Sequence, residues 1–319
     1  MIVLKQIKRV LGRIKRSIPK KNEFIKSSQW YYDQFPHLRE YQRLKQGAEF
    51  FCIGSTPAKN AIDFSITSVE GYNLAVCPET IFYDFQVLKN YHSYLNKGGH
   101  ILFVLCPFTF LKDYYRNEYG SQSYLNIRYY PILHRAMIDT YDPKIYHEWV
   151  EDPIISVKKD LKKFIRQWIK TILKIEVKEQ TCNPDTPEAS QEFCKARVKS
   201  WMREFHMPDL NPSHIPAETE NAIRGNIRIF QDMKEFIEER EYKATIVIPP
   251  FPKEMTDLLP EDLVQHTLYE PIKQTGIPYI SFYGEEEWLT RDYYYHGFLL
   301  NKTGRNLFTK KVLERINSK

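Results

Sequence analysis

The chain has 319 residues, 42% of them hydrophobic and 27% charged, with 46 Lys or Arg against 40 Asp or Glu and a formal net charge of +6. This composition excludes a wholly disordered or fibrous protein and predicts a globular chain with a sizeable core. The five cysteines are odd in number and lack the paired spacing of a zinc site, so we expect a reducing compartment and no metal.

The N-terminal segment over residues 1–26 is predicted to be a basic amphipathic arm. Residues 1–21 carry eight Lys or Arg and no acid, and apolar residues recur at helical spacing. The segment lacks the uninterrupted apolar stretch of a signal peptide or a membrane span. Two interpretations stay open: attachment to an anionic membrane surface at the inner membrane face, or a solvated helix docked on a cytoplasmic body.

Three short apolar runs, at 48–53, 72–77 and 101–106, are predicted as strands, each stopped by glycine or proline. Between the second and third, helical spacing over 79–95 predicts a helix closed by Lys97-Gly98-Gly99. A strand, a helix and a strand with short connections predict a right-handed crossover and parallel pairing.

The strand pattern is then lost over residues 109–244, which we interpret as a helical insertion. Within it, 158–179 has an apolar face opposite many lysines, and the simpler interpretation is an insertion helix that buries the apolar face and exposes the basic one. No nucleic-acid-binding motif accompanies this charge, so no nucleic-acid partner is expected. A further helix is predicted over 220–241.

The sheet resumes at 245–248, a helix around 262–275 leads to a strand at 279–282, and the last helix begins near 303. The prediction is therefore an α/β fold with a doubly wound, mainly parallel sheet, forming one domain over 27–319 that carries the insertion. In such sheets ligands bind beyond the carboxyl ends of the strands. We therefore expect the substrate to contact residues that follow the predicted strands or precede the last helix, namely Gly54, Glu79, Thr109 and Asn301.

At these positions the sequence resembles a known family. The segments FFCIGSTPAKNAIDF, GYNLAVCPETIFYDFQVLKNYHSYLNKGG, HILFVLCPFTF and FLLNKTGRNLFTKKV look like successive blocks of the SGNH (GDSL-like) hydrolases, in the bacterial branch associated with surface-polysaccharide genes. The resemblance covers the sheet segments and leaves out the insertion. It implies a flavodoxin-like architecture.

The resemblance also implies site residues. In that family a serine after the first strand attacks an ester, and here that position is Thr56, with Ser55 beside it and Gly54 before it. The glycine that binds the oxyanion is replaced by Pro78, which has no N–H to donate and is followed by Glu79.

Two further family positions are also changed. The oxyanion-binding asparagine after the third strand is absent, and Thr109 is the nearest polar candidate. The family's final block reads Asp-x-x-His-Leu-Asn-x-x-Gly. Asn301 keeps the register, which places His296 at the aspartate and Leu299 at the catalytic histidine.

A rearranged site is one alternative. In it His296 would activate Ser55 or Thr56, with Asp292 one helical turn away as the orienting carboxylate. The other alternative is an ordinary surface histidine.

Two functions follow as expectations. The chain is either an esterase or acyltransferase acting on acyl or acetyl esters of a bacterial surface glycan or its lipid-linked precursor, or a catalytically degenerate scaffold that binds a glycan or a partner at the inner membrane face. No phosphate-binding glycine loop follows a strand, so no nucleotide is expected, and no other cofactor either. A glycosyltransferase-like role would need a metal-binding D-x-D triplet, and none occurs.

Overall fold

A computed structural model of the chain describes residues 18–77, 80–112, 127–139, 141–173 and 186–318. Most of the predicted basic arm, as well as Pro78 and Glu79, lies outside the described residues. The chain divides into two compact units. A helical unit comprises 1–42 with 122–180, and a sheet unit comprises 43–121 with 181–319.

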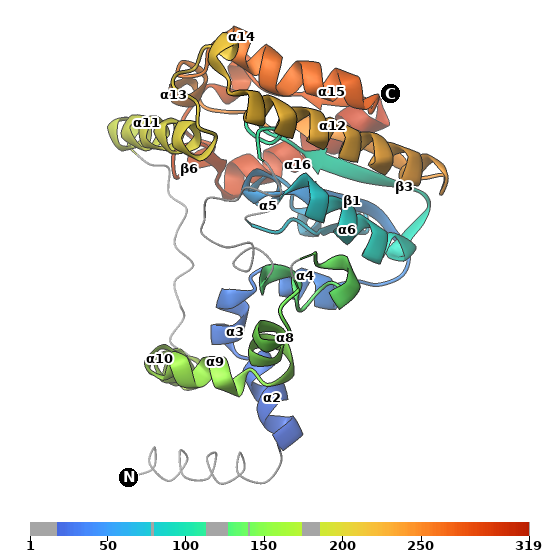
Figure 1. Ribbon diagram of the computed structural model, residues 1–319, viewed down its shortest axis with the longest axis vertical. Coiled ribbons are helices and arrows are strands. Elements are labelled where there is room, and N and C mark those ends of the chain that lie inside the picture. Colours follow the sequence, from blue (N-terminus) through green and yellow to red (C-terminus); the bar gives the residue numbers. More distant parts are fainter. Residues whose placement is uncertain (1–17, 78–79, 113–126, 140, 174–185, 319) are drawn as a thin grey trace. The chain divides into compact units, whose positions relative to one another are not determined.

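The sheet unit is built on five parallel strands in the order β2-β1-β3-β4-β5 (Figure 1). They are β1 (Ala48–Gly54), β2 (Gly71–Asn73), β3 (Leu95–Val104), β4 (Lys243–Ile248) and β5 (Tyr279–Ser281). This order is that of the flavodoxin-like doubly wound sheet, so the α/β prediction is confirmed.

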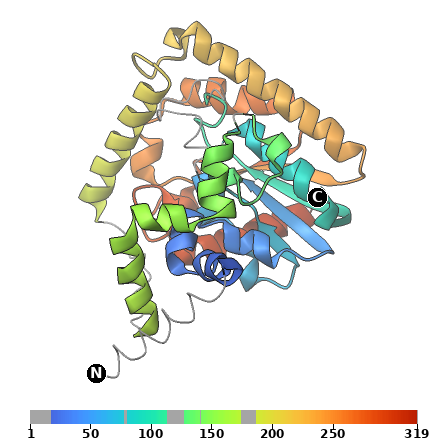
Figure 2. The same ribbon diagram turned by 60° about the horizontal axis from the view of Figure 1, so that its bottom comes forward.

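Helices cover both faces of the sheet because successive apolar side chains of each strand point to opposite sides. One face packs with α5 (Thr56–Ala61) and α16 (Lys302–Asn317) around a shared apolar cluster. On the other face lie α6 (Ile81–Tyr91), α12 (Ala217–Glu238) and α15 (Glu270–Thr275). The long gold helix α12 is seen in both ribbon views (Figures 1 and 2). Its Phe230 ring lies 5.4 Å from that of Phe103 in β3.

Strands β2 and β3 differ most from their predicted boundaries. Strand β2 ends at Asn73, whose Nδ2 donates to the carbonyls of Ala58 and Ile62 at 3.0 and 2.8 Å and so ties the chain to α5. Strand β3 begins at Leu95, so the prediction that Lys97-Gly98-Gly99 closes the preceding helix is wrong. These residues instead form an irregularity in the β1–β3 pairing, with Gly98 at φ +73°.

The predicted insertion over 109–244 does not form one body. Residues 122–180 group with the N-terminal segment, whereas 181–244 belong to the sheet unit. The reason is visible in α12, whose buried Ile223, Ile227 and Phe230 provide an apolar face for the sheet. Helix α11 (Pro187–Glu204) precedes it.

The helical unit has an aromatic core. Its helices are α2 (Ile18–Lys26), α3 (Gln29–Gln34), α4 (Leu38–Arg43, ending at the unit boundary), α8 (Pro143–Tyr146), α9 (Ile154–Lys159) and α10 (Leu161–Ile172). Trp30 stacks on Trp149 with ring centroids 5.8 Å apart, and its Nε1 donates to Asp160 Oδ2 at 3.0 Å. The Tyr31 hydroxyl donates to the Trp149 carbonyl at 2.9 Å. The two sequence segments of this unit are therefore joined by stacking and by hydrogen bonds.

The interpretation that the basic helix of 158–179 buries its apolar face is only partly correct. Phe164 of α10 packs edge-on against Trp30 at 5.9 Å. Leu161, Ile165 and Ile169, which share the predicted apolar face, are instead exposed. In the described part of the chain, no helix is long and apolar enough to cross a membrane.

The sheet unit is completed by short elements. After β4 come α13 (Lys253–Thr256), α14 (Glu261–Val264) and a π-helical turn that runs into α15. After β5, strands β6 (Tyr294–Tyr295) and β7 (Leu299–Leu300) form an antiparallel hairpin before α16.

Candidate functional site

The candidate site lies at the carboxyl edge of the sheet, where the strand order reverses between β1 and β3. At this edge Gly54 pairs with Val104, and both strands end there. Connections from β1 and β3 leave toward opposite faces at such a switch point, which opens a crevice where ligands of doubly wound folds bind. The sequence predicted this location.

Gly54 allows the chain to turn directly from β1 into α5. Its φ is +140°, and a Cβ built on it would lie 2.8 Å from both the Ala58 Cβ and the Val104 carbonyl oxygen. A side chain at this position would therefore clash with the neighbouring strand and with the helix. Gly54 shapes the backbone of the site, which is a different role from the predicted contact with substrate.

Ser55 and Thr56 occupy the first positions after the strand. Ser55 is the N-cap of α5, yet its side chain makes no capping hydrogen bond. Both residues are half-buried, and neither hydroxyl has a hydrogen-bond partner among the described residues. The two hydroxyls are thus free to bond with a ligand.

The hairpin of β6 and β7 lies against α5. The Tyr295 hydroxyl donates to Asn60 Oδ1 at 2.5 Å, and Asn60 Nδ2 donates to the Thr56 carbonyl at 2.7 Å. This chain of two hydrogen bonds joins the hairpin to the helix that follows the predicted nucleophile. Neither Asn60 nor Tyr295 was identified from the sequence, since residues 235 positions apart leave no local signal.

His296 occupies the tip of this hairpin. Its φ is +47°, and the Phe298 N–H donates to its carbonyl at 3.1 Å, which closes the turn. The imidazole is exposed, and its ring centroid lies 4.9 Å from that of Tyr295 and 6.1 Å from that of Phe193 in α11. Within the described residues the ring makes no hydrogen bond, so the structure does not couple it to either Ser55 or Thr56.

The placement of Asp292 on one helical face with His296 is wrong. The segment between them is a turn followed by β6, so the spacing of four residues does not bring the side chains together. The Asp292 carboxylate is exposed, and it has no hydrogen-bond or ion-pair partner in the described part of the chain. Its backbone carbonyl accepts from Asn301 Nδ2 at 2.8 Å.

Asn301 has a structural role that accounts for its place in the resembling block. It is buried at 3% exposure, and its Oδ1 accepts the Gly304 N–H at 3.0 Å as the N-cap of α16. With Nδ2 bonded to Asp292, both ends of the amide are occupied. The asparagine and glycine of this block therefore form a helix cap, and the predicted contact of Asn301 with substrate finds no support in this geometry.

Thr109 lies in the turn that follows β3. Its Oγ1 accepts the Cys106 N–H at 2.9 Å, and its own N–H donates to the Cys106 carbonyl at 2.9 Å. The hydroxyl thus stabilises the turn and is half-buried. Glu79, the remaining predicted contact, lies outside the described residues.

A buried carboxyl group that the sequence did not single out lies behind this edge. Asp84 in the first turn of α6 is 3% exposed. Burial raises the pKa of the Cys52 thiol well above its usual value, and the nearby Asp84 charge raises it further. The available signal was an acid inside the apolar pattern of α6.

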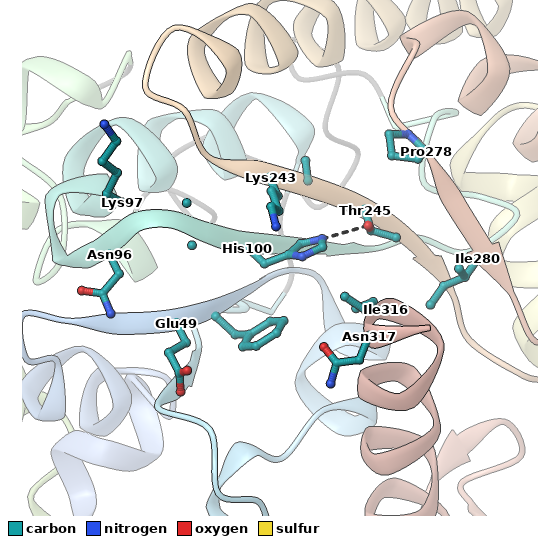
Figure 3. A pocket seen from close by; sticks show the side chains of 14 residues that line it. Glu49, Asn96, Lys97, His100, Lys243, Thr245, Pro278, Ile280, Ile316 and Asn317 are labelled. Carbon is teal, nitrogen blue, oxygen red and sulfur yellow. Dashed lines mark hydrogen bonds between the residues drawn. The ribbon is translucent and has the colours of Figure 1, made fainter. Parts of the chain in front are cut away.

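A cavity of about 790 Å³ lies at the opposite, amino-terminal edge of the sheet (Figure 3). His100 and Thr245 face each other across β3 and β4, with His100 Nε2 2.9 Å from Thr245 Oγ1. The His100 ring also stacks on Phe50 at 5.6 Å. Burial and the nearby Lys243 lower the pKa of His100 to about 4, so the imidazole is neutral near pH 7. None of the site residues predicted from the sequence lines this cavity.

Among the described residues, no group of three His, Cys, Asp or Glu side chains is arranged to hold a metal ion. Comparisons with known protein families, with curated proteins and with solved structures find no match. The resemblance to the SGNH hydrolases therefore remains a prediction from the sequence blocks.

Proposed function

We propose that the chain is a non-hydrolytic SGNH-like protein of bacterial surface-polysaccharide biosynthesis, which binds a glycan or its lipid-linked precursor at the carboxyl edge of the sheet. Three features support the proposal: the order of the resembling sequence blocks, the flavodoxin-like strand order, and the position of Gly54 and Ser55 at the switch point.

The observation that carries the proposal is the isolation of His296. A general base must reach its nucleophile by a hydrogen bond or through one water molecule. The His296 ring instead contacts the aromatic rings of Phe193 and Tyr295 and makes no hydrogen bond within the described residues. Without a base, the hydroxyls of Ser55 and Thr56 stay protonated near neutral pH, and the rate loses a factor of roughly 10² to 10⁴.

The oxyanion-binding groups of the family are also missing. Pro78 has no N–H, and the Thr109 hydroxyl already donates its proton to Cys106 Sγ at 3.4 Å. Loss of one such donor costs a factor of about 10² to 10³ in rate. The combined losses leave little of an ordinary esterase rate.

The hydroxyl groups that remain at the carboxyl edge of the sheet are suited to binding a ligand. The hydroxyls of Ser55 and Thr56 have no partner among the described residues, so each can donate to and accept from the hydroxyl and carbonyl groups of an acylated sugar. Neutral sugars are recognised through such hydrogen bonds, and no charge is required at the site.

The test is hydrolysis of p-nitrophenyl acetate by the purified full-length protein and by the Ser55→Ala, Thr56→Ala and His296→Ala variants. We expect all four proteins to turn over the ester equally slowly, within about twofold of one another and at least about 10⁴ below an ordinary esterase. Rapid hydrolysis that one of these substitutions abolishes would instead establish an active, rearranged site.

A restoration experiment tests the SGNH-like ancestry. His296→Asp, Leu299→His and Pro78→Gly together rebuild the family pattern, and position 299 lies on β7, which packs against α5. We expect esterase activity to rise at least about tenfold and to be lost again with Ser55→Ala or Thr56→Ala. The matched control carries Leu299→Gln in place of Leu299→His. A folded triple variant no more active than this control would contradict the ancestry.

A further inference from the structure

Helix α10 of the helical unit, labelled in Figure 1, carries an exposed apolar stripe. Leu161, Ile165, Ile169 and Leu173 are between 41% and 55% exposed, and they are the exposed large hydrophobic side chains of the described residues. Their spacing of four residues places them along one side of the helix and its C-cap. Such a contiguous row is unusual on a water-facing surface and marks a site of interaction.

The stripe is separate from the face that holds α10 to its own unit. Phe164 packs edge-on against Trp30 at 5.9 Å and against Phe24 at 6.4 Å. At 100° per residue, Phe164 lies about 60° from Leu161 and about 100° from Ile165 around the helix axis. The helix therefore docks through one side and presents a second apolar side outward.

Positive charge borders the exposed stripe. The helix reads LKKFIRQWIKTI, with four basic residues and no acid. Lys162, Lys163, Arg166 and Lys170 are exposed, and none forms an ion pair within the described part of the chain. Lys162 and Arg166 directly flank the apolar stripe on the side away from Phe164.

We infer that α10 docks this protein on an anionic bilayer surface, with the stripe inserted at the level of the headgroups. An exposed apolar row beside unpaired lysines and arginines fits a surface that is apolar below and negatively charged above. A second copy of α10 would place like charges side by side, which disfavours self-association through this face. The inference does not depend on ester chemistry or on a glycan ligand.

The experiment measures partitioning of the full-length protein onto vesicles of phosphatidylcholine with about 30% phosphatidylglycerol, and onto pure phosphatidylcholine. We expect Ile165→Gln with Ile169→Gln to lower the partition coefficient on anionic vesicles at least about tenfold, since two buried apolar side chains are lost. Lys162→Gln with Arg166→Gln should also lower it about tenfold or more, because each charge contributes about a fivefold factor. Pure phosphatidylcholine should bind the unchanged protein far more weakly.

The matched control is Lys195→Gln with Lys199→Gln, which removes two exposed charges from α11 and should change partitioning by no more than about twofold. Circular dichroism checks that each variant is folded. As a second readout, an environment-sensitive dye on Ile165→Cys, in a variant whose five native cysteines are replaced by alanine, should shift to the blue when anionic vesicles are added.

Three results would overturn the inference. The first is unchanged binding of the Ile165→Gln, Ile169→Gln variant, which would assign any membrane binding to other parts of the chain, including the basic arm. The second is an equal loss in the α11 control, which would indicate unspecific attraction. The third is a sedimentation-velocity experiment in which the unchanged protein is a dimer and the Ile165→Gln, Ile169→Gln variant is a monomer. That result would assign the stripe to contact with a second copy of the chain.

Discussion

At Gly54, a single residue determines how the candidate site is built. The backbone needs a positive φ, and it also passes so close to β3 that no side chain fits, with 2.8 Å between a built Cβ and the Val104 carbonyl oxygen. Gly98 also has a positive φ, +73°, but a Cβ there would meet nothing within 4 Å. A side chain at Gly98 would therefore cause backbone strain alone, whereas a side chain at Gly54 would cause backbone strain and a steric clash.

We expect Gly54→Ala to lower the free energy of unfolding by about 2 to 4 kcal/mol, because conformational strain and a steric clash add. Gly98→Ala, the matched control, should cost about 1 kcal/mol from strain alone. Urea denaturation followed by circular dichroism measures both. Equal costs at the two positions would show that the close approach of β1 to β3 does not constrain the site.

Asn301 shows that a residue can match a position of a sequence motif without having a catalytic role. Asn301 matches a family position, yet its amide caps α16 at Gly304 and bonds the Asp292 carbonyl. A pattern of Asn and Gly at this spacing is therefore explained by helix capping alone and does not indicate catalytic residues nearby.

At the scale of elements, His100 links three strands of the sheet. It belongs to β3, stacks on Phe50 of β1 and bonds Thr245 of β4 at 2.9 Å. Burial and Lys243 hold its pKa at about 4, against 6.5 when it is unperturbed. Because the folded-state pKa is the lower one, the unfolded chain binds the proton more readily between these values. The contribution of His100 to the free energy of unfolding is thus fully present above about pH 6.5 and is lost as the pH falls toward 4.

We expect the unchanged protein to lose about 2 kcal/mol more stability between pH 7 and pH 5 than a His100→Gln variant, which cannot take up this proton. Denaturation midpoints and slopes at the two pH values measure the difference. His296→Gln, at an exposed histidine with no hydrogen bond or ion pair among the described residues, serves as the control and should keep the pH dependence of the unchanged protein. A His100→Gln protein with that same dependence would show that His100 is not the responsible group.

At the scale of the whole molecule, the chain forms two compact units with separate cores. The helical unit contains Trp30, Trp149 and Trp168, and the sheet unit contains Trp201 and Trp288. Phe35 is completely buried in the first core, and Phe230 is completely buried in the second. Each unit therefore has its own buried aromatic residue for a perturbation experiment.

We expect two unfolding transitions, because a unit with its own core unfolds cooperatively by itself. Phe35→Ala should destabilise the transition of the helical unit by about 3 to 5 kcal/mol, and Phe230→Ala should do the same for the sheet unit. Tryptophan fluorescence compared with far-ultraviolet circular dichroism resolves the two. If both substitutions moved one shared transition equally, the units would be unfolding together.

The sequence by itself determined the parallel sheet, and it predicted the edge of the sheet at which we place the candidate site. Short apolar runs ending in Gly or Pro, such as the one that ends at Gly54, and a helix between two of them are local patterns, and handedness rules convert them into topology. It also identified the apolar and basic character of 158–179.

Only the tertiary structure decided which residues meet. The stacking of Trp30 on Trp149, the bond of Tyr295 to Asn60 and the exposure of Ile165 depend on contacts between segments far apart in the chain. The spacing of Asp292 and His296 indicated one helical face, but pairing of Tyr295 with Leu299 made the segment a hairpin. The spacing of two residues in the sequence says which way their side chains point only when the secondary structure is known, because helices and strands have different periods. Here the segment is a strand, and its packing in the folded protein, which the sequence pattern does not show, goes with that conformation.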